Sequence, residues 1–147
     1  MVNDHFLHPF RYSAVHPRNE PFRELVNLLF VLSDAVISHN HYDHLDVPTL
    51  KALAQRNPRT VFFVPLGNGE LLRNNNISQV VELDWGQQAD FRSLTIHCLP
   101  SQHWSKRTLT DNNRALWASW AVTGSKRRIY YAGDSGYFPG FTEIGHQ

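Results

Sequence analysis

Cysteine is almost absent from this chain. Cys98 is the only one among 147 residues, so no disulfide can form within the chain, and a single thiol suits a reducing compartment. Long apolar runs are missing too, since none reaches the roughly 18–20 residues that a membrane-spanning helix needs. The N-terminus lacks the basic start and apolar run of a secretion signal. We therefore expect a soluble, cytoplasmic protein, and peripheral contact with a membrane stays open.

Charge of one sign is not in excess either. Lysine and arginine number 14 and aspartate and glutamate 13, which gives a net charge of +1 with neutral histidine. Binding of nucleic acid through phosphate contacts normally needs a strong basic excess, so this balance argues against that class of function. The length and the 41% of hydrophobic residues suggest one globular domain over 1–147. Formation of a homo-oligomer stays open.

Strand-like and helix-like segments alternate from residue 34 onward, which is the pattern of an α/β fold. The first five signals are a strand at 34–38, a helix at 46–57, a strand at 60–64, one or two helical turns at 70–73 and a strand at 80–83. Three later segments have strand character, and the last two of them predict a hairpin: 94–99, 115–123 and 128–132. An apolar stripe at 22–32 predicts one more helix before this region, and a linker with exposed apolar side chains is the alternative.

A loop rich in histidine follows the first of these strands. It contains the imidazoles of His39, His41 and His44 and the carboxylate of Asp43. Zinc, iron and manganese accept these ligand types. A loop at the carboxyl end of a strand is where α/β folds usually keep their chemistry. A polar loop of solvated histidines is the weaker hypothesis, because such an ordered cluster rarely arises by chance.

Two further candidate ligands stand elsewhere in the chain. His103 and Asp134 each follow a predicted strand, as His39 does, so all three loops can open at one edge of the sheet. Gly133, directly before Asp134, permits a close approach of the backbone. Two alternatives stay open here: His103 as a loop histidine packed beside Trp104, and Asp134 as a turn aspartate.

Three short strings of the chain resemble one known family. The pattern His-x-His-x-Asp-His after a hydrophobic strand resembles the metallo-β-lactamase superfamily. The wider string SHNHYDHLD at 38–46 is similar to one branch of it, the N-acyl-phosphatidylethanolamine-hydrolysing phospholipase D enzymes and their bacterial relatives. PSQHW at 100–104 with KRTL at 106–109, and AGDSGY at 132–137, agree with this branch. The resemblance runs from about residue 34 to the C-terminus and implies an α/β fold that is part of an αββα sandwich.

The resemblance also implies a set of metal ligands and a cofactor. The first metal would be held by His39, His41 and His103. The second metal would be held by Asp43 and His44, and Asp134 would bridge the two metals. Asp43 would also be a catalytic residue. The expected cofactor is zinc, with two ions in the complete family domain and one here.

The implied reaction is the hydrolysis of a phosphodiester. Two zinc ions lower the pKa of water to about 7 and supply hydroxide at neutral pH. By resemblance, water would attack the phosphorus of an N-acylated phosphatidylethanolamine and release a fatty acid amide of ethanolamine and phosphatidic acid. Tyr42 is a candidate contact for the head group, and a packing role for its ring fits equally well. A phospholipid or another phosphodiester is thus the expected partner.

The chain departs from the family pattern in two places. Family members carry more sheet before the metal motif, and they carry a final histidine for the second metal well past the Gly-Asp segment. Here 13 residues follow Asp134, so we expect an incomplete family domain. Two other functions stay open: a hydrolase of the same fold with another substrate, such as a sugar lactone, and a metal-binding fragment without catalytic activity.

Overall fold

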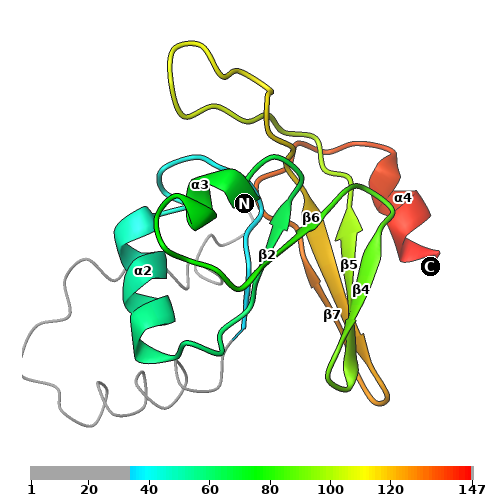
Figure 1. The fold of residues 1–147 in the computed structure, drawn as a ribbon. Helices are drawn as coiled ribbons and strands as arrows, with labels where there is room; N and C mark the ends of the chain where they lie inside the picture. The colour runs from blue at the N-terminus through cyan, green and yellow to red at the C-terminus, as the bar shows by residue number, and fades with distance from the viewer. Residues whose placement is uncertain (1–33, 147) are drawn as a thin grey trace, which may run out of the picture. The chain divides into compact units, whose positions relative to one another are not determined.

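A parallel sheet opens the part of the chain that the computed structural model describes, residues 34–146. Its strands are, in spatial order, β1 (Ala35–Val36), β2 (Phe62–Pro65) and β3 (Val80–Leu83). Two helices connect them in turn (Figure 1), α2 (Val47–Arg56) and α3 (Gly69–Arg73). The predicted alternation of strand and helix, and with it the α/β class, is confirmed. The helix predicted over 22–32 lies outside the described residues.

Local signals at both ends determine α2. The side chain of Asp46 caps its N-terminus by accepting the N–H of Thr49 at 3.0 Å. A proline follows Asn57, and the residue before a proline is disfavoured in helical geometry, so the helix stops there. The helix buries Leu50 and Leu53. Within the described region no helix combines the length and the apolar character needed to cross a bilayer.

An antiparallel sheet makes up the second layer (Figure 1). Its strands are, in spatial order, β4 (Gln88–Phe91), β5 (Leu94–Leu99), β6 (Ser119–Gly124) and β7 (Arg128–Tyr131). A short helix, α4 (Gly140–Gly145), follows β7. The sequence predicted β5 and the β6–β7 hairpin but missed β4 and α4. Strand β4 has four residues that alternate between exposed and half-buried, and α4 has a glycine at each end, so neither gives a strong signal.

Four predicted strands have different bounds in the structure. The strand predicted over 34–38 is only β1, and the strand predicted over 128–132 ends one residue earlier, as β7. The strand predicted over 115–123 begins only at β6, because the preceding residues bond to loops. One example is the N–H of Ala118, which donates to the carbonyl of Ser38 at 2.8 Å. The strand predicted over 60–64 lies slightly later, as β2, since the N–H of Thr60 still closes the turn that ends α2.

The two sheets contact each other through apolar side chains. Phe63 of β2 packs with Ile96 and Cys98 of β5 and with Trp120 of β6 in one buried cluster. Trp120 is fully buried, and its Nε1 donates to the carbonyl of Ile37 at 3.0 Å. That bond ties the antiparallel sheet to the end of β1, where the histidine-rich loop begins. Helices over one sheet with a second sheet beneath it agree with part of an αββα sandwich.

Candidate metal centre

The histidine loop, residues 38–45, leaves the carboxyl end of β1. A turn inside the loop folds it back, because the N–H groups of His44 and Leu45 both donate to the carbonyl of His41, at 3.1 and 2.8 Å. His39 is almost fully buried, whereas the side chain of Asp43 is 79% exposed. The loop therefore offers a buried imidazole on one side and a carboxylate to solvent on the other.

Three imidazole nitrogens converge at the base of this loop. Nε2 of His39 lies 2.8 Å from Nδ1 of His41, and Nε2 of His103 lies 3.1 and 3.3 Å from these two atoms. A tetrahedral metal with bonds of about 2.0–2.1 Å separates its ligand nitrogens by about 3.3 Å. The structure thus brings together the three histidines that the sequence grouped, at a spacing that fits one divalent ion.

The protonation of these rings also suits metal ligands. Burial lowers the pKa of His39 to about 2, and burial lowers the pKa values of His41 and His103 as well. The rings are therefore neutral near pH 7 and keep a lone pair. Each neutral imidazole has a single N–H, so three nitrogens that face one another cannot all be paired among themselves. A cation between them removes that conflict, and the donor set fits a divalent metal.

A second group of possible ligands lies beside the first. The atoms of His39, His44 and Asp134 lie within 4.8 Å of one another. Oδ2 of Asp134 is 3.3 Å from Nε2 of His44 and 4.0 Å from Nε2 of His103, so this carboxylate of the second group also lies near the first. Asp43 lies 3.8 Å from His44, but it joins neither three-ligand group among residues 34–146. The second group shares His39 with the first, so its own ligands are His44 and Asp134.

Ser38 is a residue that sequence reasoning missed. Its Oγ lies 3.0 Å from Nδ1 of His39 and 3.4 Å from Nδ1 of His44. With Nδ1 of His39 paired to this hydroxyl, Nε2 is left to face the other histidines. Gly133 makes room for Ser38, because its φ is +61° and a Cβ there would lie 2.5 Å from the Cβ of Ser38. The one available signal was the position of Ser38 directly before the first histidine.

Tyr42 lies at the rim of the centre and is already engaged. Its hydroxyl donates to the carbonyl of Arg107 at 3.0 Å, and the Arg107 guanidinium lies 4.1 Å from the centre of its ring. Trp104 packs edge-on against His41, with ring centres 4.3 Å apart. Tyr42 thus joins two loops of the centre through both its hydroxyl and its ring face. The predicted contact with a substrate head group stays a prediction.

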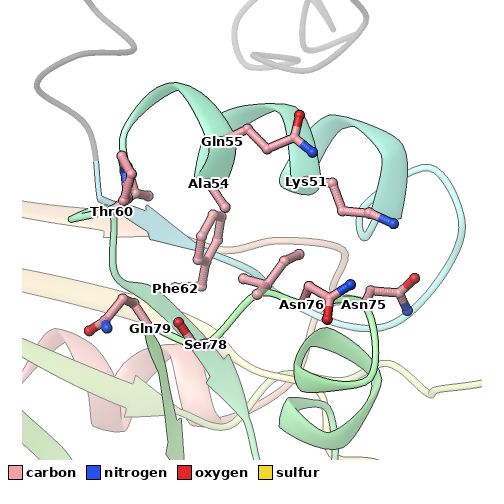
Figure 2. A pocket seen from close by; sticks show the side chains of 11 residues that line it. Lys51, Ala54, Gln55, Thr60, Phe62, Asn75, Asn76, Ser78 and Gln79 are labelled. Atoms are coloured by element: carbon pink, nitrogen blue, oxygen red, sulfur yellow. The ribbon is translucent and has the colours of Figure 1, made fainter.

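One cavity lies away from the histidines. It has a volume of about 310 Å³ and opens between α2 and the segment 75–79 (Figure 2). Lys51 and Gln55 of the helix and Phe62 of β2 line it, and none of the candidate ligands does. The chemistry of the chain is therefore to be sought at the histidine cluster.

Two sheets in contact, helices over the parallel one, and imidazoles and carboxylates gathered where strands end define the metallo-β-lactamase fold. The chain belongs to the family described as the beta-lactamase superfamily domain, whose model matches residues 4–147. The matched range includes most of the first 33 residues, which we had found to match the family poorly. The family and the fold that the histidine motif indicated are confirmed.

Individual proteins of known description are also similar to this chain. N-acyl-phosphatidylethanolamine-hydrolyzing phospholipase D 1 of Caenorhabditis elegans is 40% identical over 141 residues, which cover 90% of this chain and 38% of that protein. The mitochondrial enzyme of the same description from Saccharomyces cerevisiae is 34% identical over 107 residues, or 69% of this chain and 23% of that protein. The solved structure of CmlA, a diiron β-hydroxylase from Streptomyces venezuelae, is similar with a TM-score of 0.61 and 26% identity, covering 77% of this chain and 23% of that one. The chain thus spans well under half of each of these proteins.

Proposed function

We propose that this chain carries the metal site of a divalent-metal-dependent hydrolase that cleaves a phosphodiester of the N-acyl-phosphatidylethanolamine type. The observation that carries the proposal is the convergence of three imidazoles, with nitrogens 2.8 to 3.3 Å apart. In this proposal His39, His41 and His103 hold the first metal. His44 and Asp134 offer ligands to a second.

The chemistry divides between the ligands and the groups around them. A divalent metal held there would supply hydroxide at neutral pH and would offset negative charge on the phosphoryl oxygens. The ring of His39 is buried, and the ring of Trp104 packs against His41. Asp43 faces solvent at 3.8 Å from Nε2 of His44. In this proposal the carboxylate of Asp43 would take up a proton from the attacking water, which is its proposed catalytic role.

The choice of substrate is supported by the relatives. The proteins from Caenorhabditis elegans and Saccharomyces cerevisiae both carry the description of an N-acyl-phosphatidylethanolamine-hydrolyzing phospholipase D, at 40% and 34% identity. Zinc is the proposed metal, because imidazole and carboxylate ligands suit it. Iron suits the same ligands, and one structural relative is described as a diiron enzyme, so the experiment compares metals.

A phospholipid substrate requires that the protein reach a lipid surface. Peripheral contact with a membrane, self-association and a cytoplasmic location are proposals that follow from the sequence. Sedimentation of the chain with phosphatidylethanolamine vesicles, with and without N-acylation of the head group, tests the first of them. Binding to neither kind of vesicle would contradict a lipid substrate.

The proposed activity is tested by supplying the purified chain with Zn²⁺, Fe²⁺ or Mn²⁺ in turn. The substrates are N-acyl-phosphatidylethanolamine in mixed micelles, a soluble aryl phosphodiester and a sugar lactone. We expect release of phosphatidic acid with the first and loss of that release in His41→Ala. Turnover of the lactone alone would show that the substrate is a lactone and not a phosphodiester. Tight metal binding without turnover of any substrate would leave a non-catalytic metal-binding protein.

A further inference from the structure

The proposed ligands come from two loops that belong to different sheets. His39 and His41 lie in the histidine loop after β1, and His103 lies in the segment 102–113 between β5 and β6, here called the His103 loop. The three nitrogens meet only if these loops are held at a fixed separation. Contacts that join the loops without touching the nitrogens therefore determine the geometry of the centre.

Arg107 joins the two loops through polar contacts of its side chain and its main chain. Its Nη1 donates to the carbonyl of Asn40 at 2.9 Å and to the carbonyl of Leu45 at 2.8 Å. Asn40 stands between the two histidines, and Leu45 closes the turn that follows them. One guanidinium thus holds the middle and the end of the histidine loop.

The return contacts come from the histidine loop itself. The hydroxyl of Tyr42 donates to the Arg107 carbonyl at 3.0 Å, and Oδ1 of Asn40 accepts the N–H of Lys106 at 2.9 Å. The Tyr42 ring lies under the guanidinium at 4.1 Å, within the range of a cation–π contact. Main chain and side chain of Arg107 are therefore both bound to the histidine loop.

The backbone around Arg107 is anchored in its own loop. Oδ1 of Asp111 accepts the N–H of Arg107 at 2.9 Å and the N–H of Thr108 at 2.8 Å. Arg107 itself is half-buried, and its N–H bond to Asp111 is partly buried as well. The guanidinium consequently projects from a fixed point four residues beyond His103.

We infer that Arg107 is a positioning residue that sets the separation of His103 from His39 and His41 and so determines metal affinity. The inference rests on the proposed metal site at these histidines. Arg107 touches none of the three nitrogens, and it acts through the backbone of the loop that carries two of them. Partners of this kind outside the ligand shell typically change metal affinity by about 10–100-fold when they are removed.

The test is a titration of the full 147-residue chain with Co²⁺, followed by visible absorption and by competition with Zn²⁺. Arg107→Ala should weaken Co²⁺ binding by about 10–100-fold and alter the absorption bands that report coordination geometry. Arg107→Lys should recover part of the affinity, because an ammonium can still reach a carbonyl but lacks the planar, stacked fork. Arg114→Ala is the matched control, since it removes the same charge from an exposed position directly after the His103 loop. It should bind Co²⁺ as the unchanged chain does.

The outcomes separate this inference from the proposed function. An unchanged chain that fails to bind Co²⁺ overturns the metal site itself. An unchanged chain that binds, together with an Arg107→Ala variant of equal affinity or one no weaker than Arg114→Ala, overturns the role of Arg107 alone. Urea unfolding of the metal-free variants separates lost affinity from lost folding. Should Arg107→Ala not fold, Arg107→Lys decides, because it keeps the charge and loses the planar fork that bonds both carbonyls. Co²⁺ affinity in that variant equal to that of the unchanged chain contradicts the inference.

Discussion

Nε2 of His103 lies 3.1 Å from Nε2 of His39, although 64 positions separate the two residues in the sequence. In this pair the His103 loop of the antiparallel sheet meets the histidine loop of the parallel sheet. His41 completes the group of three. A metal held by three ligands loses much of its affinity when one is removed. The contacts of these rings therefore lead directly to a measurable prediction.

His41→Ala should lose both metal and hydrolysis. The substitution removes Nδ1 from the group and leaves two nitrogens, which hold zinc far less tightly. His97→Ala is the control, because His97 bonds to the Thr123 hydroxyl at 3.0 Å within the antiparallel sheet and lies outside both ligand groups. Metal content is measured by mass spectrometry after dialysis. Normal zinc in His41→Ala would show that the ligand set is wrong.

The chain should hold about one metal ion tightly. The first group has three imidazoles of its own, whereas the second shares His39 with it and does not include Asp43. A site with fewer ligands must complete its shell with water and binds more weakly. Titration with zinc against a chromophoric chelator gives the stoichiometry. Two equally tight ions per chain would contradict this reading of Asp43.

Gly133→Ala should destabilise the fold by at least about 2 kcal/mol. A left-handed backbone costs a residue with a Cβ roughly 1–2 kcal/mol, and here the new Cβ would also lie 2.5 Å from the Cβ of Ser38. Gly145→Ala is the control, since nothing lies within 4 Å of a Cβ at that position. Urea denaturation gives both free energies of unfolding. Equal effects of the two substitutions would mean that the contact with Ser38 is unimportant.

Glu82→Gln should destabilise the chain at pH 7 and progressively less toward low pH. Burial alone would raise the pKa of Glu82, but hydrogen bonds from Arg73 and from the N–H groups of Gly69 and Gly67 more than offset it, and the net pKa is lowered. A folded pKa below the unfolded one gives stability that is present above about pH 4.3 and is lost as pH falls through the folded pKa.

The amide cannot accept all these bonds, so we expect a loss of about 1–3 kcal/mol at pH 7. Urea unfolding at pH 7 and at pH 3 gives the two differences. Glu143→Gln, at an exposed position of α4, is the control for a simple change of charge. A difference between Glu82→Gln and the unchanged chain that stays constant with pH would rule out ionised Glu82 as the cause.

Local signals explain why much of the fold was predictable. Asp46 caps α2 through Thr49, three residues away, and β3 and β5 begin and end where the apolar pattern placed them. The family resemblance grouped His39 with His103, and the order of strands and loops placed their loops at one edge of the sheet. Each of these inferences needed only neighbouring residues or the order of elements.

Contacts between distant residues explain what sequence reasoning missed. Arg107 lies 67 positions from Asn40, and nothing in the string around it indicates that its side chain binds that carbonyl. Ser38 acquires its place from Gly133, whose positive φ depends on the finished fold. Strand β4 is a strand because β5 pairs with it, since its own four residues carry little apolar pattern.

The long separation between His39 and His103 has a kinetic consequence. Closing a flexible loop of 64 residues costs about 4 kcal/mol of chain entropy beyond a constant. The β4–β5 and β6–β7 hairpins and the β1–α2–β2 unit close much shorter loops, and short-range contacts of this kind form faster. We therefore expect the rings of the centre to meet late in refolding, after each sheet has formed. When metal is present during refolding, we expect the rate of metal binding to be lower than the rate at which the helical circular dichroism signal returns.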